Sequence, residues 1–297
     1  MIQYSTVRYL QSKQPIDDRA INRHVLSELE RFVRARPTTP RVLELGAGVG
    51  TMVSRLADWN VLGDAEYTLV DREGESLAAA RRHLESWGTV TQSSVDAIAV
   101  EKAGRRLDVE FVRRDLFEFL DGASRAEKYD LVFANAVLDL TDLEPTLPRI
   151  WQALAPGAGF WFTINFDGET IFLPELRNDA TVAALYHGSM TRDTDSKRAG
   201  HPETGRRLLL AIPASRARLV AAGSSDWVVF PTGGVYPGDE AYFLHHIIDT
   251  VHTTLRGLVG LEPRALEEWV ATRHAQADRG ELIYIAHQLD VFGLGPS

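Results

Sequence analysis

Apolar residues in the first half of the chain occur in short blocks, separated by longer segments of mixed character. Blocks of four or five residues rich in aliphatic, β-branched and aromatic side chains, bounded by turn residues, are typical of strands buried on both faces. The segments between them repeat apolar residues at helical spacing, as residues 51–59 do after the first block. The expected strands are residues 42–45, 67–70, 109–112, 131–134 and 160–164. Strands that alternate with helices predict a parallel sheet with right-handed crossovers, which binds ligands at the carboxyl ends of its strands.

The first expected strand runs directly into three closely spaced glycines, Gly46, Gly48 and Gly50, within the segment RVLELGAGVG. Glycine permits positive φ and lets a ligand approach the backbone, and the helix expected next offers free N–H groups at its start. The sequence therefore predicts a nucleotide-like ligand at this turn. The spacing G-x-G-x-G departs from the dinucleotide pattern G-x-G-x-x-G, and Glu44 stands just before the turn. A carboxylate there suits a cationic ligand better than a pyrophosphate.

The stretch E-L-G-A-G-V-G resembles the first motif of the class I S-adenosylmethionine-dependent methyltransferases, and later positions follow the order of that family. Asp71 ends the second expected strand, where an acid accepts hydrogen bonds from ribose hydroxyls. Asp115 and Leu116 follow the third strand at the place of the family's adenine site. Asn135 and Asp139 follow the fourth, near the methyl donor. Each of these residues alone also fits a turn or a helix cap, so the prediction depends on their common order.

The resemblance implies S-adenosyl-L-methionine as the cofactor. The cofactor-binding residues that it implies are Glu44, Gly46, Ala47, Gly48, Gly50, Asp71, Arg72, Asp115, Leu116 and Asn135.

The fold that the resemblance implies is α/β, with a seven-stranded, doubly wound, mostly parallel sheet whose last strand is antiparallel. The segments SSDWVVF and ELIYIAHQL are the expected sixth and seventh strands. We expect a single domain over residues 1–297. Its parts are an N-terminal helical cap (1–37), a cofactor-binding core (38–165), a lid insertion after strand five (166–205) and C-terminal helices with strands six and seven (206–297).

The N-terminal segment PIDDRAINRHVLSELERFV repeats apolar residues near helical period and predicts one amphipathic helix that begins at Pro15. Packing against the sheet is the simpler interpretation of this helix. The alternative is a cap over the cofactor pocket, with Tyr9, Lys13 or Arg19 reaching inward.

The segment from residue 165 to 205 mixes turn residues with a charged run, and a loop of this size in a compact domain is more often functional than idle. We interpret it as a lid. Candidates for facing a substrate are Asn165, Glu169, His187, Met190 and Arg192. Candidates for holding a carboxylate or phosphate of the substrate are Arg192, Arg198, Arg206 and Arg207. The alternatives are a structural histidine at 187 and a solvated surface for the charged run.

Composition excludes several other classes of protein. Lys plus Arg number 32 against 41 Asp plus Glu, so the net charge of −9 disfavours nucleic acid as a partner. The apolar runs are too short to cross a bilayer. The chain has no cysteine, which fits a cytoplasmic protein and removes thiolate metal sites. His245 and His246 are adjacent and diverge on a helix, so no metal site is expected, and a homodimer is left open.

The function expected from the resemblance is methyl transfer from S-adenosyl-L-methionine to an O, N or C atom of a small metabolite. A general base would assist some acceptors, and Asp139, Glu169 and His187 are weak candidates for that role. One alternative is a protein that binds the cofactor without transferring the methyl group, as a regulatory module or for other chemistry. A second is a nicotinamide-dependent oxidoreductase, which the glycine spacing and Glu44 disfavour.

Overall fold

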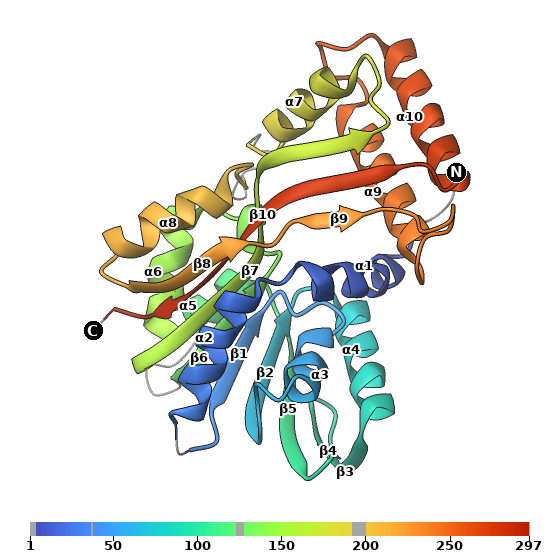
Figure 1. The fold of residues 1–297 in the computed structure, drawn as a ribbon. Coiled ribbons are helices and arrows are strands. Elements are labelled where there is room, and N and C mark those ends of the chain that lie inside the picture. Colours follow the sequence, from blue (N-terminus) through green and yellow to red (C-terminus); the bar gives the residue numbers. More distant parts are fainter. Residues whose placement is uncertain (1–3, 37, 123–127, 192–199, 297) are drawn as a thin grey trace.

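A computed structural model describes residues 4–36, 38–122, 128–191 and 200–296 of the chain. Through these residues runs one mixed sheet of ten strands in the order β3-β4-β5-β2-β1-β6-β7-β10-β8, with β9 also paired to β10 (Figure 1). The strands are β1 (Arg41–Leu45), β2 (Ala65–Asp71), β3 (Thr89–Ser93), β4 (Ala97–Lys102), β5 (Arg105–Arg113), β6 (Tyr129–Asn135), β7 (Leu154–Leu173), β8 (Arg218–Ser224), β9 (Trp227–Val229) and β10 (Ile283–Leu294).

The five strands expected from the apolar blocks form the centre of this sheet. β5, β2, β1, β6 and β7 are parallel neighbours, as alternation with helices predicts. β10 is antiparallel to β7, which confirms the expected direction of the last strand. The carboxyl ends of the parallel strands therefore meet at one edge, where the glycine-rich turn follows β1.

The sheet has ten strands rather than the seven expected. The hairpin of β3 and β4 was not expected, and its β4 pairs antiparallel with β5. The expected sixth strand, SSDWVVF, contains β9, whereas β8 precedes it and was not expected. None of the β3 residues is buried, so this strand leaves no apolar block in the sequence. The alternating burial of β8 and β10 arises from one-sided packing, which gives a weaker pattern than the continuous blocks of the centre.

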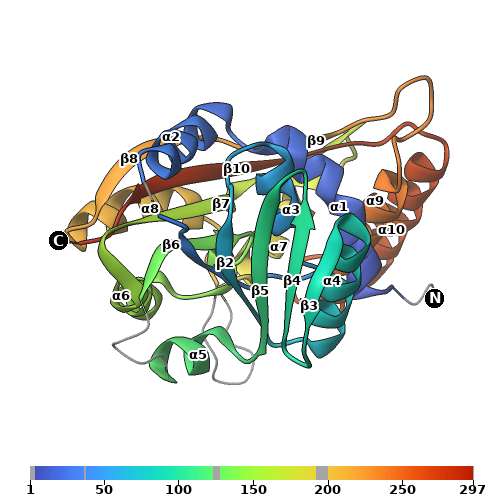
Figure 2. The ribbon, with the colours of Figure 1, turned by 90° about the horizontal axis from the view of Figure 1, so that it is seen from below.

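Helices cover both faces of the sheet, and each face has its own cluster of buried apolar residues. α2, α3 and α4 pack on one face, and α5, α6 and α8 pack on the other (Figure 2). The helices are α1 (Thr6–Ala20), α2 (Arg23–Arg34), α3 (Thr51–Asp58), α4 (Gly74–Trp87), α5 (Leu116–Gly122), the 3-10 turn η1 (Leu138–Leu140), α6 (Leu143–Ala153), α7 (Asp179–Ser189), α8 (Thr204–Ala214), α9 (Glu240–Leu255) and α10 (Pro263–Asp278).

A third group of helices, α1, α7, α9 and α10, lies beyond the carboxyl ends of the parallel strands, with α9 packed against the other three (Figure 1). The buried Arg273 of α10 connects this helix to α7 and to the end of β7. Its Nη2 donates to Asp179 Oδ2 at the start of α7 (2.6 Å), and its Nη1 donates to the carbonyl of Pro174 after β7 (2.8 Å). None of the helices in the described part of the chain combines the length and apolar character that crossing a membrane requires.

The N-terminal segment forms two helices, not the single helix expected. Pro15 lies inside α1, and the chain turns at Ile21 before α2 begins. The side chain of Asn22 caps α2, because its Oδ1 accepts hydrogen bonds from the backbone N–H groups of His24 and Val25 (3.1 Å each). The apolar period continues across this break, so the period alone does not reveal it.

The segment expected to form a lid begins as a strand. β7 continues past residue 165 to Leu173 because its second half pairs with the first half of β10. α7 then follows, and α8 begins at Thr204. Arg192 and Arg198 lie outside the described residues. The partner strand β10 is far along the chain, which explains why local turn residues suggested a loop here.

Candidate functional site

The glycine-rich turn after β1 has the backbone conformation that only glycine adopts easily. Gly46, Gly48 and Gly50 have φ values of 64°, 55° and 67°. A Cβ atom at Gly46 would lie 2.5 Å from Cγ2 of Val137, and one at Gly50 would lie 2.7 Å from Cβ of Ala80. Close packing therefore requires glycine at positions 46 and 50. Gly48 instead faces α1, where the absence of a side chain leaves space between the turn and this helix.

A small pocket lies between this turn and α1. It contains five of the residues predicted for cofactor binding and adds residues from the N-terminal helix. The lining residues are Leu10, Lys13, Asp17, Glu44, Gly46, Ala47, Gly48, Val49, Thr51 and Asn135. α1 thus covers the pocket, in line with the cap interpretation.

α1 places a buried ion pair in the pocket. Lys13 Nζ lies 2.9 Å from Asp17 Oδ2, and the two residues are only 8% and 2% exposed. Trp227 Nε1 donates to the other oxygen of Asp17 (2.8 Å). Lys13 was an expected inward residue; Asp17 was not, although its spacing of four from Lys13 on a helix is visible in the sequence. Arg19 instead pairs with Glu240 at 2.7 Å.

Glu44 is the buried carboxyl group of the pocket, 2% exposed. Tyr67 of the neighbouring strand donates its hydroxyl hydrogen to Glu44 Oε2 (2.8 Å). Burial raises the pKa of Glu44 to about 7, although the hydrogen bond from Tyr67 opposes the shift. A cation that entered the pocket would favour the ionised form of this group.

Asp71 lies at the carboxyl end of β2 and reaches back to the glycine-rich turn. Its Oδ2 accepts a hydrogen bond from the backbone N–H of Gly48 (2.8 Å), and its Oδ1 accepts one from Glu73 (2.9 Å). Arg72 points to solvent and forms an exposed ion pair with Glu73 (3.2 Å). Asp71 therefore helps to hold the turn in shape, besides any contact with a ligand.

Asp115 and Leu116 lie at the end of β5, the strand beside β2. Asp115 Oδ1 accepts a hydrogen bond from the backbone N–H of Phe117 (2.9 Å), so this residue caps α5. Leu116 is half-buried. The two residues lie on the same edge of the sheet as Asp71, outside the small pocket itself.

Of the three candidates for a general base, His187 and Glu169 lie near each other and Asp139 lies apart from them. His187 of α7 is hydrogen-bonded to Thr170 Oγ1 (3.0 Å), and burial lowers its pKa while the nearby, exposed Glu169 raises it. Asp139 lies in η1, just after β6. Burial raises the pKa of Asp139 to about 6, and Lys13 opposes the shift. Asp139 therefore interacts with the same α1 residue that lines the small pocket.

Two further substrate-facing candidates contact the protein interior. Asn165 is fully buried, and its Nδ2 donates to the carbonyl of Leu289 on β10 (2.8 Å). Met190 caps the end of α7 and packs against the core. Neither contact points to a ligand.

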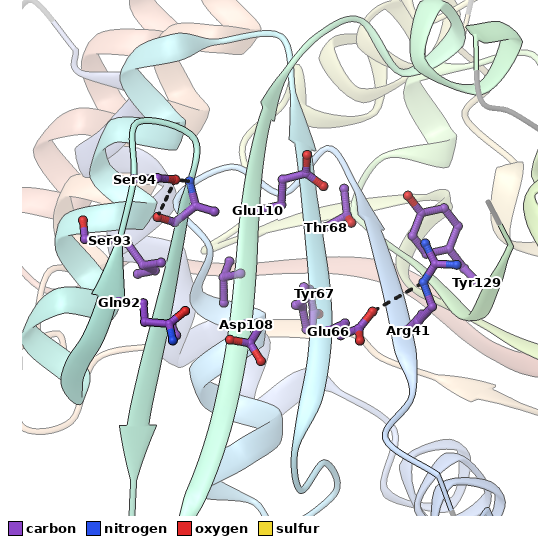
Figure 3. A pocket seen from close by; sticks show the side chains of 14 residues that line it. Arg41, Glu66, Tyr67, Thr68, Gln92, Ser93, Ser94, Asp108, Glu110 and Tyr129 are labelled. Carbon is purple, nitrogen blue, oxygen red and sulfur yellow. Dashed lines mark hydrogen bonds and ion pairs between the residues drawn. The ribbon is translucent and has the colours of Figure 1, made fainter.

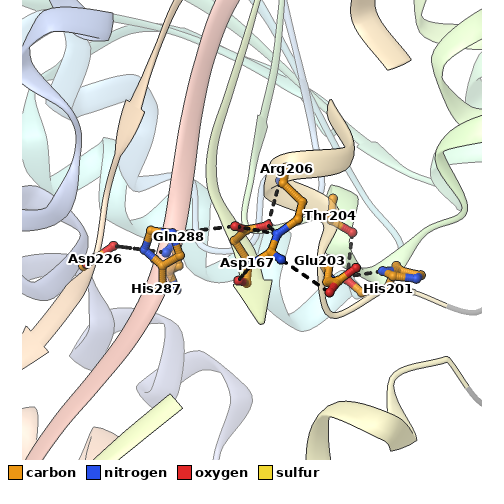
Figure 4. Close-up of polar contacts among 8 residues, drawn as sticks. All are labelled: Asp167, His201, Glu203, Thr204, Arg206, Asp226, His287 and Gln288. Carbon is orange, nitrogen blue, oxygen red and sulfur yellow. Dashed lines mark hydrogen bonds and ion pairs between the residues drawn. The ribbon is translucent and has the colours of Figure 1, made fainter. Parts of the chain in front are cut away.

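The expectation that Arg206 holds an anionic substrate is not supported by the structure, because its guanidinium is already paired. Arg206 Nε lies 3.0 Å from Asp167 Oδ1, and the Arg206 backbone N–H donates to the same oxygen (2.7 Å; Figure 4). His287 stands on the other side of Asp167, with Nε2 3.6 Å from Oδ2, and its Nδ1 lies 2.8 Å from Asp226. These contacts tie α8 to β7, β10 and the turn before β9. Arg207 is half-buried on α8.

A larger hollow, of about 420 Å³, lies at the amino-terminal half of the parallel strands (Figure 3). Exposed acidic side chains line it, among them Glu66, Asp108 and Glu110, and Arg41 pairs with Glu66 at 3.6 Å. Ligands of parallel α/β sheets bind at the opposite, carboxyl edge, where the glycine-rich turn lies. We therefore place the functional site at the smaller pocket.

Comparison with known proteins matches part of this chain to a family model. Residues 43–160 match a family model described as "Methyltransferase domain". The matched segment includes every residue predicted to bind the cofactor, from Glu44 to Asn135. No curated protein matches the chain.

Several solved structures are similar to this chain at low sequence identity. A SAM-dependent methyltransferase from Geobacter sulfurreducens with S-adenosyl-L-homocysteine is 16% identical, with 100% of each chain covered and a TM-score of 0.49. One from Thiobacillus denitrificans, also with S-adenosyl-L-homocysteine, is 16% identical (97% and 99% covered, TM-score 0.48). A phosphoethanolamine N-methyltransferase 2 from Haemonchus contortus is 12% identical with a TM-score of 0.49, and 98% of this chain spans 58% of that one.

Proposed function

We propose that residues 43–160, which match a family model described as "Methyltransferase domain", form a class I S-adenosylmethionine-dependent methyltransferase domain, and that the chain transfers a methyl group to an O, N or C atom of a small metabolite. The observation that carries the proposal is the pocket at the carboxyl edge of the sheet. The glycine-rich turn, a buried carboxyl group and the buried Lys13–Asp17 pair meet there. We further propose that the whole chain acts as one domain, in the cytoplasm, as the absence of cysteine suggests.

The residues of the pocket fit S-adenosyl-L-methionine. Lys13 offers a cation for the carboxylate of its amino-acid end, and Asp17 and Glu44 offer carboxylates for its ammonium group. Gly48 leaves the turn without a side chain where the cofactor would pass, and we assign Asp71 to the ribose and Asp115 with Leu116 to the adenine. When bound, the cofactor supplies a methyl group on a positively charged sulfur, which a nucleophile accepts.

The chain's own residues then have three tasks. α1 covers the pocket and excludes water, which strengthens each charged contact inside it. Asn135 and the turn orient the reacting end of the cofactor. Asp139 in η1, whose pKa burial raises to about 6, takes up a proton where the acceptor must lose one. Much of the rate would come from positioning.

Titration of the purified protein with S-adenosyl-L-homocysteine, with NADH as the control ligand, tests the proposal. We expect micromolar binding of S-adenosyl-L-homocysteine and none of NADH. Binding followed by transfer of a labelled methyl group to components of a metabolite extract would support the enzyme. Binding without any transfer would favour a protein that only carries the cofactor, and tight NADH binding alone would favour the oxidoreductase.

Cofactor affinity should depend on pH through Glu44. This group becomes protonated as the pH falls through about 7, and the neutral form no longer attracts a cation. We expect binding of S-adenosyl-L-methionine to weaken by up to about tenfold between about pH 8 and pH 6. Calorimetry across this range measures the effect. Glu44→Gln should bind weakly with a flat profile, and Glu66→Gln, an exposed carboxyl on β2, should keep the wild-type profile. A wild-type profile in Glu44→Gln would contradict the assignment.

A further inference from the structure

The hollow at the amino-terminal half of the parallel strands exists because the helices leave part of one sheet face uncovered. α5, a helix of seven residues, packs near Val70 and Val112 at the carboxyl ends of β2 and β5. Thr68 and Glu110, two residues earlier on the same strands, line a space of about 420 Å³ instead (Figure 3). A volume of this size is in the range of small-molecule sites.

The first row of side chains across the hollow holds a carboxylate without a cation. Strand pairing places Glu110 of β5 between Ala97 of β4 and Thr68 of β2. The carboxyl group of Glu110 forms no ion pair with the described residues. Thr68 is only 9% exposed, and its hydroxyl, which is open to the hollow, has no partner among the described residues either. Polar groups of such buried residues are normally paired, so this row indicates a ligand that donates hydrogen bonds.

The second row brings two carboxylates together. Asp108 of β5 is the register partner of Glu66 on β2, and like charges in that position repel each other. Arg41 approaches Glu66 only to 3.6 Å, which is beyond hydrogen-bond distance. Arg106 lies 2.8 Å from Asp108, but it is shared with Glu101 on β4 at 3.4 Å. A cation between the two carboxylates of this row would relieve their repulsion.

The charges around the hollow do not balance. The two rows and their neighbours contribute four carboxylates and two guanidinium groups, so two negative charges are in excess. Such an excess attracts cations and repels phosphates and carboxylates. Residues on one face of a strand are about 6.5 Å apart. The two rows are therefore separated by roughly the length of a four-carbon chain with an amino group at each end.

We propose that this hollow binds a linear diamine. One ammonium group lies against the carboxylate of Glu110 and the hydroxyl of Thr68, and the other lies between Glu66 and Asp108. The alkyl chain between them runs along β5, beside the small alanine side chains of β4. The inference does not depend on the proposed methyl transfer, because the cofactor pocket lies at the opposite, carboxyl end of the strands.

Putrescine, a four-carbon diamine, is the probe for this site. Calorimetry on the full chain at low ionic strength would measure its binding. Butylamine carries the same alkyl chain with one ammonium group, and butanediol is a neutral molecule of the same length. We expect putrescine to bind and the other two to bind at least about tenfold more weakly, because each lacks one or both charged contacts.

Matched variants test the rows separately. Glu110→Gln should weaken putrescine by about tenfold, because it removes the unpaired carboxylate. Thr68→Val keeps the shape of the side chain without its hydroxyl and should weaken binding by about threefold. Ala97→Leu keeps every charge but fills the space beside Glu110, so it should weaken binding by at least about tenfold. Glu268→Gln removes an exposed carboxylate on α10 and should change nothing.

The outcomes distinguish a built site from general attraction to an acidic protein. Absence of putrescine binding, or equal binding of butylamine, would overturn the proposal. An equal loss in Glu110→Gln and Glu268→Gln would do so too, because the ligand would then respond only to the net charge. Wild-type affinity in Ala97→Leu would place the ligand outside the hollow. Circular dichroism spectra and Tm values that match the wild type would show that the variants are folded.

Discussion

Replacing Gly48 with arginine should abolish binding of S-adenosyl-L-homocysteine and leave the protein folded. Gly48 has a φ of 55°, which costs a residue with a side chain about 1–2 kcal/mol. A Cβ atom there would lie 3.1 Å from Cδ1 of Leu10, so the longer side chain must enter the pocket between the turn and α1. The strain and the lost space together should weaken binding by at least about a hundredfold, which calorimetry measures directly.

Gly157→Arg is the matched control for this variant. Gly157 also has a positive φ, 71°, but no atom lies within 4 Å of the Cβ position there. The same backbone strain is therefore introduced away from the pocket. We expect Gly157→Arg to bind the ligand normally. Equal loss of binding in the two variants, or normal binding by a folded Gly48→Arg protein, would show that the turn does not contact the cofactor.

Arg273→Ala should lower the free energy of unfolding by about 3–5 kcal/mol. The guanidinium is fully buried, and it is paired with Asp179 and hydrogen-bonded to Pro174 and Gln276. It also lies over the ring of Phe172, 5.3 Å from the ring centre. Truncation leaves the carboxylate of Asp179 without its cation and leaves a cavity between α10 and α7. Urea unfolding followed by circular dichroism measures the loss.

Arg264→Ala provides the comparison within the same helix. Arg264 is 91% exposed on its side chain, and among the residues that the structure describes it pairs only with Glu268, one turn along α10. An exposed pair of this kind contributes at most about 0.5 kcal/mol. A loss of similar size in the two variants would mean that helix propensity, and not the buried ion pair, determines the effect.

The centre of the sheet could be predicted from the sequence because its strands are buried on both faces. β6, for example, is an almost unbroken run of buried residues, and such a run stands out without knowledge of its neighbours. β3 has no buried residue and is stabilised by its pairing with β4. Because β3 forms only through pairing with another strand, the pattern of apolar residues within it does not predict a strand. The second half of β7 was taken for a loop for the same reason.

The meeting of several candidate residues in one pocket was also predictable. The glycines follow β1, Glu44 lies near the end of β1 and Asn135 ends β6, and parallel strands bring such residues to one edge. Asp17 was not foreseen. It comes from α1, and only the way this helix packs over the glycine-rich turn brings it into the pocket.

The place of β10 has a consequence for how the protein is made. β10 lies between β7 and β8 in the sheet but follows both along the chain. At about 5–20 residues per second, a ribosome completes β7 several seconds before β10 emerges. During that interval β7 and β8 have unpaired edges, and such edges readily pair with strands of other chains. We therefore expect the newborn chain to depend on chaperones during this period, with the parallel half of the sheet able to form before β10 reaches its place.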